Sequence, residues 1–138
     1  MRKVLAGGTF NLIHPGHILF LEKARRLGDR LVVVVASDRT VLRSKGIVVM
    51  KAGARKKILE SLRMVDKAVI GDEKDFMKVV RKEKPQIIAL GHDQELDADM
   101  RGQIEKLGIK TVRIKSRAAG YKTEYILKPF RIGKRPRG

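Results

Sequence analysis

Residues 4–36 read VLAGGTFNLIHPGHILFLEKARRLGDRLVVVVA, and this segment contains a complete strand–helix–strand unit. A short apolar run at residues 4–6 is ended by two glycines, and residues 15–27 carry apolar side chains at helical spacing. Residues 31–36 form a continuous apolar run, rich in β-branched valine. A strand without polar residues is covered on both faces, which is typical of parallel sheets in α/β proteins.

The same alternation continues along the chain and predicts the remaining elements. We expect helices at residues 55–64, 74–84 and 100–107, and strands at residues 68–70, 87–90 and 111–114. Residues 39–51 are polar and basic, and we expect a flexible loop there. The pattern predicts an α/β fold: a single Rossmann-like domain with a mainly parallel five-stranded sheet and helices on both faces. We expect this domain to span residues 1–127, followed by a basic C-terminal tail at residues 128–138.

Composition excludes several classes of site. The chain of 138 residues has no cysteine, so disulfides, cysteine zinc sites, iron–sulfur clusters and thiol nucleophiles are excluded. Its 32 Lys and Arg against 15 Asp and Glu give a net charge of +17, which attracts anions such as nucleotides, phosphorylated metabolites or nucleic acid. The start of the chain has no signal-peptide pattern, and the longest apolar run is too short for a bilayer, so we expect a cytoplasmic protein without a membrane partner.

The candidate chemistry lies where the predicted strands end, because ligands of open parallel sheets bind beyond the carboxyl ends of the strands. In the first such segment, Pro15 suits the first turn of a helix, and His14 and His17 are spaced to bring both rings to one side of the helix start. Gly16 lies between them and adds no bulk. Two imidazoles at a helix N-terminus form a site for an anion whose charge is growing.

The segment Gly8-Thr9-Phe10-Asn11-Leu12-Ile13-His14-Pro15-Gly16-His17 resembles the GTFDxxHxGH signature of the nucleotidyltransferase superfamily that includes cytidylyltransferases. Three further stretches resemble elements of that family: residues 63–66 (RMVD), residues 91–94 (GHDQ) and residues 117–126 (RAAGYKTEYI). The resemblance covers roughly residues 3–127. Among the branches, the combination of motifs is most similar to the archaeal FMN adenylyltransferases, with the glycerol-3-phosphate cytidylyltransferases next.

The resemblance implies a reaction in which a substrate phosphate attacks the α-phosphorus of a nucleoside triphosphate and pyrophosphate leaves. A divalent metal, usually magnesium, would bridge the triphosphate, and FMN with ATP would be the favoured substrates. The implied catalytic residues are His14, His17 and Arg117. The implied nucleotide contacts are Thr9, Phe10, His14, Pro15, Gly16, His17, Asp93, Gly120, Tyr121 and Thr123. The implied contacts to phosphate or to the second substrate are Lys45, Arg55, Arg63 and Lys122.

One departure from the family pattern stands inside the first motif. Asn11 occupies the place of the usual aspartate, and an amide neither acts as a base nor binds metal as strongly as a carboxylate. If the aspartate of the family touches metal or orients a histidine, activity here is altered, and a member that binds nucleotide without turnover is one alternative.

Other functions stay open at this point. CTP with glycerol 3-phosphate is the runner-up substrate pair, and pantetheine-phosphate adenylyltransferases share the first motif. The net charge also suits a basic nucleic-acid-binding module, but the chain has no helix-turn-helix signature and only 4% aromatic residues for stacking bases. Members of the family are often dimers, so a homodimer is one expected state, although no dimer patch is identified.

Overall fold

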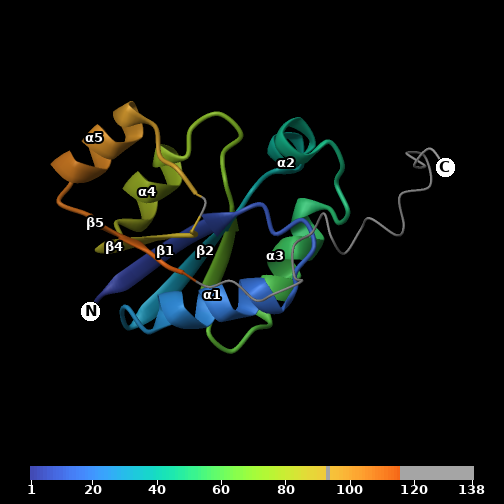
Figure 1. Ribbon diagram of the computed structural model, residues 1–138, viewed down its shortest axis with the longest axis horizontal. Helices are drawn as coiled ribbons and strands as arrows, with labels where there is room; N and C mark the ends of the chain where they lie inside the picture. The colour runs from blue at the N-terminus through green and yellow to red at the C-terminus, as the bar shows by residue number, and fades with distance from the viewer. Residues whose placement is uncertain (93, 116–138) are drawn as a thin grey trace.

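The computed structural model describes residues 1–92 and 94–115, and Figure 1 shows their arrangement. The elements follow in the order β1 (Lys3–Gly8), α1 (Pro15–Arg25), β2 (Arg30–Val35), α2 (Asp38–Lys45), α3 (Ala52–Glu60), β3 (Lys67–Ile70), α4 (Met77–Glu83), β4 (Ile87–Leu90), α5 (Ala98–Lys106) and β5 (Lys110–Arg113). The strands form one parallel sheet in the order β3-β2-β1-β4-β5. The predicted α/β fold with a five-stranded parallel sheet is confirmed.

Alternate side chains of the central strands point to opposite faces of the sheet and build two apolar layers. On one face, Val4 and Val33 pack with Leu21 of α1 and Leu59 of α3. On the other, Leu5 and Val32 belong to a cluster that contains buried residues of α4 and α5. Helices therefore cover both faces, as predicted (Figure 1).

The expected loop at residues 39–51 is wrong in its first half, because the structure has helix α2 there. Ser37 caps this helix by accepting a hydrogen bond from the Thr40 amide on its Oγ, at 3.2 Å. Gly46 ends it in the left-handed region, with φ of 79°. The helix was missed because its eight residues are mostly charged or polar and only Val41 is buried, so capping and charge, and not apolar spacing, mark it.

The other differences concern boundaries. Helix α1 ends at Arg25, two residues before the predicted end, and α3 ends four residues early at Glu60. After α1, Gly28 lets two backbones approach each other: a Cβ there would lie 2.5 Å from the carbonyl oxygen of Arg2.

Across residues 1–92 and 94–115, no helix combines the length and the apolar character needed to cross a bilayer. The expected domain boundary at residue 127 and the expected basic tail lie outside the described residues.

Candidate active site

Two histidine rings stand at the start of α1, just beyond the end of β1. His14 is the N-cap residue, and its Nδ1 accepts a hydrogen bond from the Gly16 amide at 3.1 Å. The Nδ1 of His17 accepts from the backbone amide of His14 at 3.2 Å, which completes a reciprocal capping box. The rings are stacked with their centroids 4.0 Å apart. The predicted meeting of the two imidazoles at the helix start is therefore what the structure has.

The capping bonds determine the chemistry that each ring offers. Because each Nδ1 accepts a hydrogen bond, we assign the neutral tautomer with its hydrogen on Nε2 to both rings. Burial lowers the pKa of His14. Burial, and then the positive charges of His14 and Lys45, lower the pKa of His17 to about 4. Near neutral pH both rings are thus neutral and carry their hydrogen on Nε2, at a helix N-terminus that favours negative charge.

An aromatic side chain supports this pair from the preceding turn. The ring of Phe10 is buried and lies 5.2 Å, centroid to centroid, from that of His17. Phe10 has a positive φ of 49°, an uncommon conformation for a bulky residue. Its ring also covers Gly8, where a Cβ would lie 3.0 Å from a ring atom. The phosphate contacts predicted for the backbones of Thr9 and Phe10 stay a prediction.

Lys45 is exposed at the last turn of α2. After burial and the charge of His14, the positive charge of Lys45 is a further cause of the lowered pKa of His17. A cationic group from another element therefore acts electrostatically on the start of α1. The contact of Lys45 to a phosphate stays a prediction.

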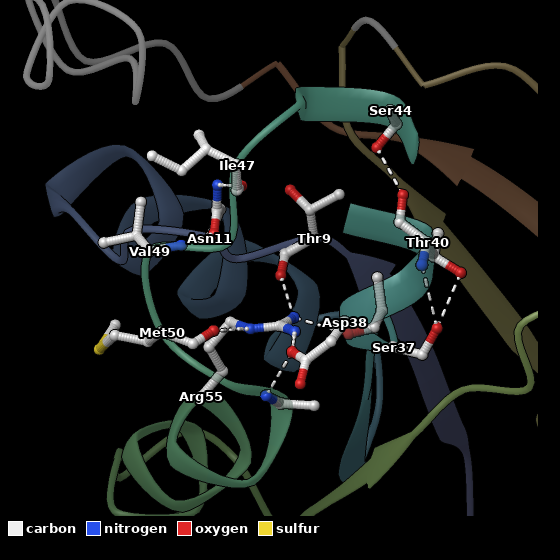
Figure 2. Close-up of polar contacts among 12 residues, drawn as sticks. Thr9, Asn11, Ser37, Asp38, Thr40, Ser44, Ile47, Val49, Met50 and Arg55 are labelled. Atoms are coloured by element: carbon white, nitrogen blue, oxygen red, sulfur yellow. Dashed lines mark hydrogen bonds and ion pairs between the residues drawn. The ribbon is translucent and has the colours of Figure 1, made fainter. Parts of the chain in front are cut away.

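Arg55 does not have the predicted role of a substrate contact. Its side chain is completely buried at the start of α3. The guanidinium forms its hydrogen bonds with acceptors of the protein itself, as Figure 2 shows. The guanidinium donates to the carbonyl oxygens of Thr9 at 2.7 Å and Ala36 at 2.6 Å. It also donates to the carbonyl oxygen of Met50 at 2.9 Å and to Asp38 Oδ1 at 2.8 Å. Arg55 thus joins the ends of β1 and β2 to α2 and to the start of α3.

The position of Arg63 also does not suit its predicted contact to a phosphate or to the second substrate. It is exposed and lies between the end of α3 and the start of β3, which is the edge of the sheet opposite the histidines. The neighbouring Asp66 is paired with another arginine: Arg25 Nε lies 3.3 Å from Asp66 Oδ2, which also accepts from the Leu31 amide at 2.7 Å. Arg63 is therefore too far along the fold to meet the same phosphates as His14 and His17.

Two side chains that sequence reasoning gave no role hold the segment after β4. Gln94 Oε1 accepts from the Gly91 amide at 2.8 Å, and its Nε2 donates to the Gly7 carbonyl at 3.1 Å. Arg113, at the end of β5, donates to the carbonyl oxygens of Gly91 at 2.8 Å and of Gln94 at 2.7 Å. The only available signal was the GHDQ motif itself, in which Gln94 follows the strand end.

Several predicted contacts lie outside the described residues: Asp93, Arg117, Gly120, Tyr121, Lys122 and Thr123. In the described part of the chain, no three metal-binding side chains of His, Asp or Glu gather into a site. A site without its own set of metal ligands is still compatible with magnesium that is bound to the triphosphate, because Mg²⁺ keeps several waters and binds through substrate phosphates.

Comparisons with known proteins agree with this geometry. The family described as "Cytidylyltransferase-like" matches residues 5–132. A protein of Ferroglobus placidus named FAD synthase is 46% identical over 119 residues, 86% of this chain and 78% of that protein. Another FAD synthase, of Aciduliprofundum boonei, is 48% identical over 83% of this chain and 79% of its own length. A solved structure from Thermoplasma volcanium, titled a lipopolysaccharide core biosynthesis protein, is 43% identical with a TM-score of 0.77, covering 86% of this chain and 99% of the other.

Proposed function

The chain belongs to the cytidylyltransferase-like family, and from this premise we propose that it is a nucleotidyltransferase that makes FAD and pyrophosphate from FMN and ATP. The reaction type is supported by one observation above the others: two imidazoles are stacked at the N-terminus of α1, and each ring is oriented by a capping bond to its Nδ1. The acceptor is supported by curated relatives named FAD synthase that share 46–48% of their residues with this chain over most of both lengths.

The chemistry balances without any covalent enzyme intermediate. An oxygen of the FMN phosphate attacks the α-phosphorus of ATP, and a new P–O–P bond forms. The bond from the α-phosphorus to the bridging oxygen of the β-phosphate breaks in line, and pyrophosphate leaves with the electron pair. Negative charge grows on the oxygens of the α-phosphate during this step. Donors that are already in position stabilise such charge, which is the main catalytic contribution available to the enzyme.

Four groups of this chain have proposed roles in that step. His14 and His17 donate Nε2–H bonds to oxygens of the α-phosphate, and they need no prior protonation to do so. Lys45 supplies a full positive charge for the phosphates beside them. Arg117 and the turn from Gly120 to Thr123 are proposed to hold the β- and γ-phosphates, and Asp93 the ribose or base. Magnesium would be held by the phosphates of ATP, and it would offset part of the charge of the triphosphate.

An assay that varies the acceptor tests this proposal directly. Purified protein is incubated with ATP, magnesium and FMN, and the flavins are separated; we expect FAD and pyrophosphate in equal amounts. Parallel incubations contain CTP with glycerol 3-phosphate, and ATP with pantetheine phosphate. The identity of the acceptor is the part of the proposal that most needs this test, because the similar structure from Thermoplasma volcanium is titled a lipopolysaccharide core biosynthesis protein. Turnover of another pair without any FAD would overturn the assignment to FMN.

The basic nucleic-acid module is the rival from another class, and the net charge of +17 is its support. Binding of an oligonucleotide that survives high salt, together with no affinity for triphosphates, would favour it.

A further inference from the structure

Both polar atoms of the Asn11 side chain form hydrogen bonds with the segment that joins α2 to α3, as Figure 2 shows. We call this segment, residues 46–51, the α2–α3 connection. The Nδ2 of Asn11 donates to the carbonyl oxygen of Ile47 at 2.8 Å, and its Oδ1 accepts from the amide of Val49 at 2.8 Å. The side chain is 2% exposed. A buried amide is matched here to one acceptor and one donor, which an ionised carboxylate cannot match.

The far end of the connection is held in the same way. Arg55 Nε donates to the carbonyl oxygen of Met50 at 2.9 Å, and Asp38 Oδ1 accepts from the amide of Ala52 at 2.7 Å. Between Asn11 and Arg55, the connection is thus fixed at residues 47, 49 and 50 against the end of β1. Lys45 comes only two residues before the first of these points. The single residue between them is Gly46, in the left-handed conformation.

We propose that Asn11 is a positioning residue: through the α2–α3 connection, it holds Lys45 beside the phosphate-binding histidines. The inference rests on the proposed reaction only in needing a bound triphosphate, and it is independent of the acceptor. It also assigns a structural role to Asn11, which stands where the family signature has an aspartate. The polar atoms of Asn11 engage the backbone of the connection, so the departure alters how this segment is held.

Asn11→Asp changes one atom of this contact and gives it a pH dependence. The ionised carboxylate keeps an acceptor for the Val49 amide, but it faces the Ile47 carbonyl with no hydrogen to donate. The protonated carboxyl restores the donor, and burial raises the pKa of such a group. The defect should therefore be largest at high pH and disappear as the pH falls. Asn11→Ala loses both contacts at every pH and serves as the reference for a defect that does not titrate.

The experiment measures the Kd of ATP with magnesium, in the absence of FMN, for wild type and variants from pH 5 to pH 8. Losing one buried hydrogen bond of this kind predicts a Kd about tenfold above wild type for Asn11→Asp at pH 8. The ratio to wild type should approach one by pH 5, and taking this ratio removes the titration of ATP and of His17. Gln103→Glu is the matched control, because it makes the same amide-to-acid change on α5, where Gln103 Nε2 donates to Asp99 at 2.9 Å; its ratio should stay near one.

A double-mutant cycle separates positioning from general support of the fold. If Asn11 acts through Lys45, Asn11→Asp should change the Kd less than twofold in a Lys45→Ala background. An equal loss in both backgrounds would overturn the inference, and so would a defect with no pH dependence. If Asn11→Asp is unfolded at pH 8, both backgrounds are compared at the highest pH at which the variant is folded; a defect there that is lost in the Lys45→Ala background supports the inference, and one that persists overturns it. Wild type that binds ATP but makes no FAD would refute the proposed acceptor and leave this inference standing.

Discussion

Replacement of Arg55 by alanine distinguishes the observed structural role of this residue from the substrate contact that its sequence position suggests. In the structure the side chain is 0% exposed and donates to three backbone carbonyls and one carboxylate. Truncation leaves the carbonyl oxygens of Thr9, Ala36 and Met50 without this donor. Asp38 loses its ion pair, but its side chain is 43% exposed and water can solvate it.

The magnitude follows from the number of orphaned acceptors. The three carbonyls belong to half-buried residues, so each lost donor is taken at the low end of the usual range, about 1 kcal/mol, and three cost about 3 kcal/mol. Removal of one partner from a buried charge pair falls in a similar range, about 3–5 kcal/mol. For a chain of this length, about 3 °C of melting temperature is lost per kcal/mol, so we expect Tm to fall by about 10 °C.

Urea unfolding followed by circular dichroism gives the free energy, and thermal melts give Tm. Two variants accompany Arg55→Ala. Arg55→Lys keeps the charge but concentrates its donors at one point, so it should recover only part of the loss. Arg101→Ala removes an exposed arginine from α5 and should change the unfolding free energy by less than about 0.5 kcal/mol. If Arg55→Ala melts within 2 °C of wild type, while KM for ATP or FMN rises more than about tenfold, the structural reasoning fails and Arg55 is a substrate contact after all.

Three further predictions concern the histidine pair and the opposite edge of the sheet. His17→Ala should lower kcat by about 10²–10³, the loss typical of one transition-state donor, while losing about 1 kcal/mol of unfolding free energy with its cap; steady-state kinetics and urea curves measure both, and normal kcat in a destabilised protein would contradict the role. Because the pKa of His17 is lowered to about 4, the unfolded chain binds more protons than the folded one between pH 6.5 and 4, so stability should fall across that window as the pH drops. The share of this loss that comes from His17, up to roughly 3 kcal/mol, should be absent in His17→Ala, while the lowered pKa of His14 leaves a dependence of its own in both proteins; a wild-type stability that is constant from pH 7 to 4.5 would refute the reasoning. Burial alone would raise the pKa of Glu83, but Lys67 and Lys3 together hold it below its usual value, so its contribution is present at neutral pH and is lost in acid. Glu83→Gln should therefore be less stable than wild type by about 1–3 kcal/mol at pH 7, with the gap closing as the pH falls below the usual range of a glutamate; a gap that persists at pH 3 would argue against the ion pairs.

The apolar strands were predictable because their signal is local. Every residue of Leu31–Val35 is buried, and the unbroken apolar run predicts that burial without any knowledge of partners. The start of α1 was predictable for a similar reason, since Pro15 and the two histidines occupy one turn of helix. The two histidines are close in sequence, and their rings bond to backbone amides of the same turn, so no long-range contact is needed to bring the rings together.

The roles of the basic residues were not predictable in the same way. Arg55 and Arg63 lie eight residues apart and look alike in sequence, but one is buried at the carboxyl edge of the sheet and the other is exposed at the opposite edge. What separates them is the length of α3, which runs from one edge of the sheet to the other, and the four acceptors that Arg55 meets from distant segments. Neither the helix boundary nor the acceptors are visible in the residues around the arginines.

The first motif itself contains two kinds of polar residue, and only the structure tells them apart. His14 and His17 use Nδ1 for the helix cap, whereas Asn11 uses both ends of its amide on the backbone of the α2–α3 connection. Because the amide engages that connection, the capping bonds that orient the two histidines do not involve position 11. The presence of Asn11 in place of the usual aspartate thus becomes a question about how firmly Lys45 is held. The Kd of ATP, measured without FMN, answers that question separately from turnover.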